Sequence, residues 1–82
     1  MKNITDYALL IVSSLCKEPD MVKVSCYSGD DDKTILDIAV PEASMGAVIG
    51  KNGKNAKSIR TLIETYAYLH NLGRLTINID SF

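Results

Sequence analysis

The stretch that decides the fold is Gly46-Ala47-Val48-Ile49-Gly50-Lys51-Asn52-Gly53-Lys54-Asn55-Ala56-Lys57-Ser58-Ile59-Arg60. Gly50 and Gly53 predict a tight turn between two helices, because glycine adopts backbone angles that other residues avoid and lets another molecule approach closely. Successive N–H groups in such a turn can form a nest for an anion, and the unpaired amides at the start of the next helix add to the attraction. Lys51 and Lys54 bring positive charge to the same place. The stretch therefore predicts a turn that binds a run of phosphates.

The apolar residues on both sides of this turn follow the periods of regular elements. We predict a helix over 4–17, strands over 22–27 and 35–40, a short helix over 43–49, a long helix over 54–71 and a last strand over 75–80. Three strands need helices over one face to bury their apolar side chains. The fold class is therefore α+β, in the order α-β-β-α-α-β. We expect a single domain over 1–82, with a three-stranded sheet and the helices packed on one face.

The ends of the helices carry recognisable signals. Asn3 or Thr5 is expected to cap the first helix, and Pro19 is expected to end it. Gly73 is expected to supply the left-handed residue that ends the long helix. The residues 28–32 between the first two strands read as a hairpin connection.

Cysteine usage and hydropathy bear on the cellular compartment. Cys16 and Cys26 fall on apolar positions of the predicted patterns, so we expect two buried, unpaired thiols. Their spacing suits neither a zinc site nor a disulfide framework. The longest apolar-rich run covers 7–16, which is too short to span a bilayer. These features favour a cytoplasmic protein without a membrane segment.

Charge is distributed unevenly along the chain. The net charge is -1, which alone argues against a nucleic-acid binder. The segment 46–74 nevertheless carries +4, from five basic residues against one acidic residue, while the rest of the chain carries -5. A local positive field can attract a phosphate backbone even when the whole chain is slightly acidic.

Val48-Ile49-Gly50-Lys51-Asn52-Gly53, followed by Ile59, resembles the V-I-G-x-x-G-x-x-x-x-x-I signature of KH domains. The element order resembles the type II arrangement, and the length and the flanking residues resemble the small stand-alone bacterial KH proteins of the KhpA family. The resemblance implies binding of single-stranded RNA, with the turn holding the backbone of about four nucleotides. The RNA-binding residues expected on this basis are Val48, Ile49, Gly50, Lys51, Asn52, Gly53, Lys54, Ala56, Lys57, Ile59 and Arg60.

By the same resemblance, apolar side chains next to the turn form a groove for unstacked bases. Val48, Ile49 and Ile59 are expected to contact those bases, and the edge of the second strand, over 36–40, is a candidate for reading them. One departure from a strongly basic loop is the polar pair Asn52 and Asn55, where another basic residue would strengthen phosphate binding.

The family resemblance also implies a cellular setting. KhpA-like proteins are cytoplasmic RNA chaperones that form homodimers and pair with a larger KH protein of the KhpB (Jag) type. The pair is linked to control of cell-wall growth and cell length. No cofactor, membrane or small-molecule substrate is implied.

Two other interpretations of the sequence remain open. The chain could be a protein-interaction or dimerisation module whose RNA binding is weak or supplied by a partner, and the acidic overall charge supports this. Apolar side chains also exceed what one buried stripe per helix needs, and a contiguous patch of them would mark an interface; the surplus is Tyr7, Leu10, Tyr66, Tyr68 and Leu69. The two helices joined by a glycine turn could also be a DNA-binding helix-turn-helix.

We expect neither catalysis nor a metal site. The acidic run over 30–32 lacks the spaced ligands of a calcium loop. His70, the single histidine, lies at the end of the long helix and fits a capping or surface role.

Overall fold

A computed structural model describes residues 3–29 and 33–82 of the chain. Its elements run in the order α1 (Ile4–Ser13), η1 (Pro19–Met21), β1 (Lys23–Ser28), β2 (Lys33–Val40), α2 (Glu42–Ile49), η2 (Lys51–Gly53), α3 (Lys54–Leu69) and β3 (Arg74–Ser81). The two η elements are single turns of 3₁₀ helix. This order confirms the predicted α-β-β-α-α-β arrangement.

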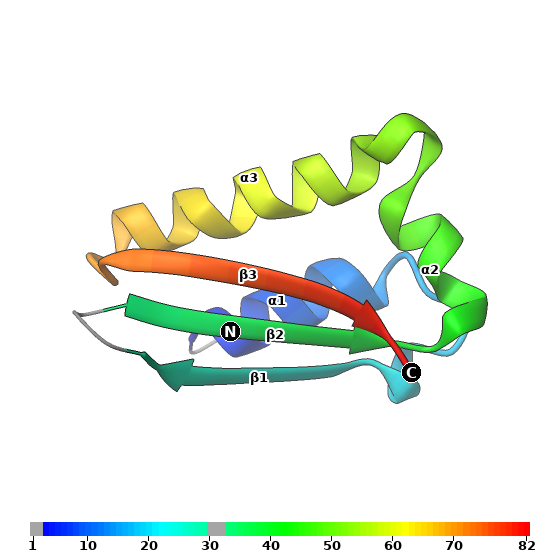
Figure 1. Ribbon diagram of the computed structural model, residues 1–82, viewed down its shortest axis with the longest axis horizontal. Helices are drawn as coiled ribbons and strands as arrows, with labels where there is room; N and C mark the ends of the chain where they lie inside the picture. The colour runs from blue at the N-terminus through cyan, green and yellow to red at the C-terminus, as the bar shows by residue number, and fades with distance from the viewer. Residues whose placement is uncertain (1–2, 30–32) are drawn as a thin grey trace.

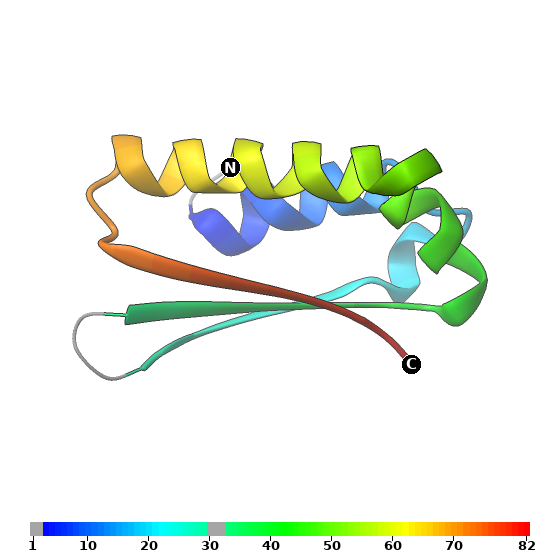
Figure 2. The ribbon, with the colours of Figure 1, turned by 45° about the horizontal axis from the view of Figure 1, so that its top comes forward.

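The three strands form one sheet in the order β1-β2-β3. β1 pairs antiparallel with β2, with Cys26 opposite Leu36, and β3 pairs parallel with β2, with Ile77 opposite Leu36. A parallel neighbour needs a crossover, and α2, η2 and α3 supply it. The helices lie over one face of the sheet, as Figures 1 and 2 show, and this confirms the predicted α+β layering.

The core lies between the sheet and the helices. Leu36, Ile38 and Val40 on β2 alternate with more exposed residues and are buried, as the period of two predicts. Among the residues that the structure describes, twelve apolar side chains are buried: Ile4, Ala8, Val12, Val22, Leu36, Ile38, Val40, Val48, Ile59, Ile63, Ala67 and Ile77. The same core holds both helices that flank the glycine turn, so the turn is fixed at both ends.

The first helix begins as predicted and ends earlier than predicted. The Asn3 side chain accepts a hydrogen bond from the Asp6 amide at 2.9 Å, which caps the helix. α1 ends at Ser13 instead of residue 17. The Ser13 and Ser14 hydroxyls donate to backbone carbonyls three residues back, and such bonds compete with helix continuation. Pro19 opens the η1 turn and does not end α1.

Asn71, and not Gly73, provides the left-handed residue at the end of α3. Its φ is 54°, and the Leu72 amide donates to the Ala67 carbonyl at 3.0 Å while the Asn71 amide donates to the Tyr68 carbonyl at 3.2 Å. This pair of bonds is a Schellman motif, which accepts asparagine as well as glycine. Gly73 also has a positive φ, of 75°, but lies in the connection to β3.

The prediction for the cysteines is wrong for Cys26. Its side chain is on the helix side of the sheet, opposite Leu36, yet it is exposed. β1 is an outer strand, so a side chain there has a strand neighbour on one side only. Cys16 is half-buried, and both thiols are free. Residues 30–32 of the predicted hairpin connection lie outside the described part of the chain.

Candidate nucleic-acid interface

The glycine turn joins α2 to α3 through backbone angles that favour glycine. Gly50 has φ 75° and ψ 176°, Asn52 has φ 57° and ψ 26°, and Gly53 has φ 75° and ψ 13°. The Gly50 conformation belongs to a region that only glycine occupies readily, and the other two are left-handed. Asparagine is one of the few other residues that tolerate the left-handed region. The polar Asn52, which looked like a departure from a basic loop, therefore fits the backbone at this position.

Asn55 fastens the turn to the end of α2. Its Nδ2 donates a hydrogen bond to the Ala47 carbonyl at 2.7 Å. A Cβ added to Gly50 would lie 2.6 Å from the Asn55 Cγ, closer than real contacts allow. Gly50 is thus required by packing as well as by its backbone angles. A Cβ on Gly53 would meet nothing within 4 Å, so the backbone on that side is open to an incoming molecule.

Part of the predicted nest of amides is already used within the protein. The Gly50 amide donates to the Gly46 carbonyl at 2.9 Å, and the Gly53 amide donates to the Gly50 carbonyl at 3.2 Å. The Lys54 amide donates to the Lys51 carbonyl. These three groups are not free for a phosphate. Gly53 caps α3 without a side-chain hydrogen bond, so the next amides of the first turn of α3 are the ones left for an anion.

The eleven predicted RNA-binding residues fall into three groups by exposure. Six are exposed: Ile49, Lys51, Asn52, Lys54, Lys57 and Arg60. Three are half-buried: Gly50, Gly53 and Ala56. Val48 and Ile59 are 0% and 2% exposed and belong to the core. These two side chains cannot contact a base directly in this structure, and they instead hold α2 and α3 against the sheet. Ile49, 40% exposed, is the apolar side chain that the turn does present.

No residue in the described part of the chain neutralises the positive charge at the turn. Lys51, Lys54 and Lys57 have no ion pair within residues 3–29 and 33–82. All three are exposed and belong to η2 or the first turns of α3. The positive end of the α3 dipole lies at the same place. The turn therefore combines open backbone, uncapped amides and unpaired lysines.

The strand edge near α3 belongs to β3, not to β2. β2 is the central strand and is paired on both sides, so the prediction that it reads bases through a free edge is wrong. The crossover places the last strand outside β2, next to α3 (Figure 1). Arg60 reaches from α3 to this edge, where its Nη1 donates to the Ile77 carbonyl at 2.9 Å. Arg60 is one of the predicted RNA-binding residues, but nothing in the sequence indicates this contact.

The open face of the sheet carries a polar cluster across all three strands. The Tyr27 hydroxyl donates to one oxygen of Asp37 at 2.8 Å, and the Asn78 Nδ2 donates to the other at 2.9 Å. The bonds from Asn78 and Tyr27 lower the pKa of Asp37, and the same Asp37 bond raises the pKa of Tyr27. This cluster ties the strands together on the side away from the helices.

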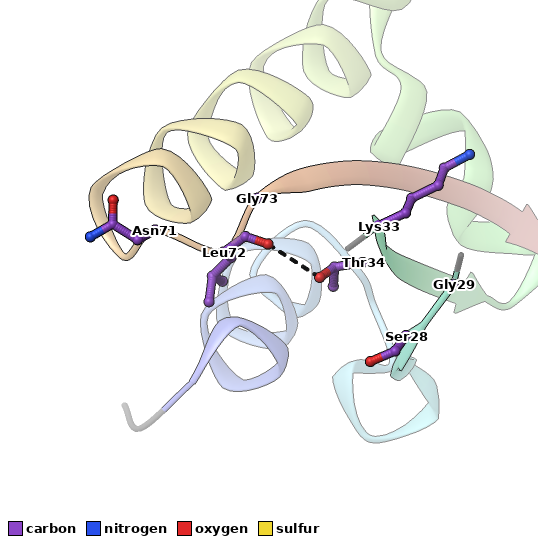
Figure 3. Close-up of a pocket in the computed structure, with 7 residues that line it drawn as sticks. All are labelled: Ser28, Gly29, Lys33, Thr34, Asn71, Leu72 and Gly73. Carbon is purple, nitrogen blue, oxygen red and sulfur yellow. Dashed lines mark hydrogen bonds between the residues drawn. The ribbon is translucent and has the colours of Figure 1, made fainter. Parts of the chain in front are cut away.

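A polar pocket of about 460 Å³ lies near the start of β2 and the end of α3. Figure 3 shows its lining, with the Thr34 hydroxyl 3.4 Å from the Leu72 carbonyl and the Lys33 side chain directed away from that contact. It is built from elements other than the glycine turn, and it adjoins residues 30–32 in sequence.

The described residues contain no group of three or more histidine, cysteine, aspartate or glutamate side chains placed to hold a metal ion. None of the helices over 3–29 and 33–82 has the length and apolar character needed to cross a membrane.

Comparison with known structures shows the fold. The chain superposes on Era in complex with a stretch of 16S ribosomal RNA with a TM-score of 0.63 and 21% identity, covering 95% of this chain and 29% of Era. Against Aquifex aeolicus Era the TM-score is 0.62 with 23% identity, covering 96% and 30%. The chain thus spans less than a third of these proteins, and the likeness concerns the fold alone.

Comparison with known sequences gives the family. The chain is 44% identical to the RNA-binding protein KhpA of Clostridium acetobutylicum over 74% of its length and 80% of the relative. It is 39% identical to KhpA of Clostridium perfringens over 76% and 81%, and 36% identical to KhpA of Bacillus subtilis over 76% and 75%. These relatives are named for RNA binding and not for a reaction. The family described as KhpA/KhpB, KH domain matches residues 5–79. The chain therefore belongs to the KhpA/KhpB family of KH-domain proteins.

Proposed function

We propose that this chain binds single-stranded RNA through the turn Gly50–Gly53 and the start of α3. The observation that carries the proposal combines two features. Lys51, Lys54 and Lys57 form no ion pair with any described residue, and the first turn of α3 is uncapped. A Cβ on Gly53 would meet no atom within 4 Å apart from its chain neighbours, so an RNA backbone has open space on this side of the turn. The relatives named RNA-binding protein KhpA support RNA as the polymer.

The binding site follows from the exposed members of the predicted set. Lys51 and Lys54 neutralise phosphates, and the amides that follow Lys54 in the first turn of α3 donate to one of them. Ile49 offers an apolar surface beside the turn for a base. Val48, Ala56 and Ile59 support this surface from below. Asn52 keeps the turn in its left-handed conformation, and Gly50 and Gly53 keep the backbone accessible.

A charge-reversal experiment tests this proposal. Lys51→Asp with Lys54→Asp removes two phosphate contacts, and we expect the affinity for a short unstructured RNA to fall by about tenfold or more because both attraction and counterion release are lost. Lys17→Asp with Lys33→Asp is the matched control, since it changes the charge equally at two exposed lysines outside the turn.

Fluorescence anisotropy with a labelled RNA measures the RNA affinity of both double variants, and circular dichroism verifies that they are folded. Each lost phosphate contact should also reduce the slope of log affinity against log salt by about 0.7. Equal loss of affinity in the two double variants would show that the net charge of the chain, and not the turn, determines RNA binding. Stronger binding to duplex DNA than to RNA would favour the helix-turn-helix alternative.

The cellular role that we propose is that of an RNA chaperone which acts with a KhpB (Jag)-type partner in cell-wall growth and cell-length control. The support is membership of the KhpA/KhpB family. Co-purification of the partner with the tagged chain, compared with the turn variant, tests whether pairing depends on RNA. Unchanged cell length in a deletion strain would remove the cellular part of the proposal.

We also propose a homodimer, which the exposed apolar side chains of the helices support. Leu10, Tyr68 and Leu69 are 57%, 81% and 69% exposed. Of the predicted surplus, Tyr7 and Tyr66 are half-buried and stack on each other at 4.8 Å. Sedimentation equilibrium of the chain and of Leu69→Glu tests the dimer, and a monomer at all concentrations in the unaltered chain would reject it. A dimer that binds no RNA would favour the protein-interaction alternative.

A further inference from the structure

The outer edge of β3 makes a contact that plays no part in the proposed binding of phosphates at the turn. β3 is paired only with β2, so its other edge carries backbone groups without strand partners. The Arg60 Nη1 donates to one of them, the Ile77 carbonyl, at 2.9 Å. That carbonyl therefore points away from β2. α3 lies alongside this edge in Figures 1 and 2, so Arg60 bridges the helix that starts at the turn and the free edge of the sheet.

Most of the N–H donors of Arg60 have no partner among residues 3–29 and 33–82. A guanidinium has five N–H donors in a planar fork, and the bond to Ile77 accounts for Nη1 only. Arg60 is exposed and makes no ion pair within residues 3–29 and 33–82. Because one end is fixed to the strand, the orientation of the fork is set before a ligand arrives, which lowers the entropy cost of binding.

The position of Arg60 suits a base more than the phosphates held at the turn. It lies six residues after Lys54, about 9 Å along the helix. This distance is within the stretch of about four nucleotides that one KH domain holds. The bond to Ile77 also holds the guanidinium at the β3 edge, away from the uncapped amides of α3.

From these observations we propose that Arg60 makes this site select guanine. Guanine presents two neighbouring acceptors, O6 and N7, which match a guanidinium fork, whereas adenine and cytosine present an amino donor at the corresponding place. The Ile77 carbonyl, which could accept from such an amino group, already accepts one hydrogen bond from Arg60. This selectivity rests on the proposed RNA binding and adds to it the identity of one base.

The test uses a set of labelled eight-nucleotide RNAs, all uridine except for one central guanosine, adenosine, cytidine or 7-deazaguanosine. For the unaltered chain we expect the guanosine probe to bind about 5- to 100-fold more tightly than the adenosine probe. The 7-deazaguanosine probe lacks the N7 acceptor and should lose most of this advantage. Arg60→Ala should bind the guanosine and adenosine probes within about twofold of each other.

Arg60→Lys separates charge from the shape of the fork. It keeps the positive charge but not the planar pair of donors, so it should also lose the preference for guanosine. Circular dichroism and thermal melting establish that both variants are folded. A preference for guanosine that survives in Arg60→Ala, or its absence in the unaltered chain, would overturn the inference.

Failure of the inference can be told apart from failure of the proposed function. If Arg60 contacts only phosphate, Arg60→Ala weakens all probes by the same factor, and the inference alone is rejected. If the turn is not the RNA site, Lys51→Asp with Lys54→Asp binds every probe as well as the unaltered chain does. That result rejects the proposed function, and the inference with it.

Discussion

Gly50→Ala should destabilise the chain much more than Gly53→Ala, although both glycines have a φ of 75°. At Gly50 the ψ of 176° places alanine in a region that costs about 1–3 kcal/mol. The new Cβ would also lie 2.6 Å from the Asn55 Cγ. If Asn55 moves away, its bond to the Ala47 carbonyl is lost, at about 0.5–1.5 kcal/mol. The total is about 2–4 kcal/mol.

Gly53→Ala is the matched control for this substitution. Its left-handed conformation costs alanine about 1–2 kcal/mol, and its Cβ would meet no atom within 4 Å. For a chain of this size the stability itself is about 4–12 kcal/mol. The loss at Gly50 should therefore lower the thermal midpoint by about 10 °C or more, and the loss at Gly53 by less.

A double-mutant cycle with Asn55→Ala isolates the clash. Asn55→Ala removes the Cγ and Nδ2 atoms that the new methyl group would meet, and leaves the Asn55 Cβ at 2.9 Å. The free energy of unfolding, from urea titrations followed by circular dichroism, should show the double variant less destabilised than the sum of the single variants by about 0.5–2 kcal/mol. Additive losses, or equal losses for Gly50→Ala and Gly53→Ala, would refute the packing argument.

Two further predictions concern the sheet and the end of α3. Because hydrogen bonds from Asn78 and Tyr27 lower the pKa of Asp37 in the folded chain, its contribution to stability is complete above the unfolded-state pKa, about 3.9, and is lost as pH falls through the lower folded value. The acid unfolding curve of Asp37→Asn should lack this contribution, and an unchanged curve would contradict it. Asn71→Ala should cost about 1 kcal/mol and Asn71→Gly almost nothing in urea titrations, since Asn71 has a φ of 54°; equal losses would remove its role as a cap.

The sequence predicts the helices and strands well because apolar residues on a buried face recur with the period of the element. The alternation of Leu36, Ile38 and Val40 indicates which face of β2 is buried, and Gly50 and Gly53 indicate the turn. The same pattern does not say how completely a side chain is covered. The family resemblance predicts that Val48 and Ile59 contact bases, but both side chains are buried in the core.

What the sequence could not predict depends on contacts between distant residues. Cys26 has the right face for burial, but its exposure follows from the position of β1 at the edge of the sheet. Asn71 and Gly73 both tolerate a positive φ, and only the hydrogen bonds at the end of α3 decide between them. The hydrogen bond from Arg60 to Ile77 joins a helix to a strand, and no periodic pattern in the sequence relates these two residues.

The most direct test of the account is to map RNA contacts on the backbone amides by NMR. In a titration of the ¹⁵N-labelled chain with a short unstructured RNA, we expect the largest shift changes over 51–57, at η2 and the first turn of α3. The Lys51→Asp and Lys54→Asp double variant should lose them. Shift changes concentrated on β1 or on the open face of the sheet, with the amides of 51–57 unaffected, would contradict the claim that this turn holds the RNA backbone.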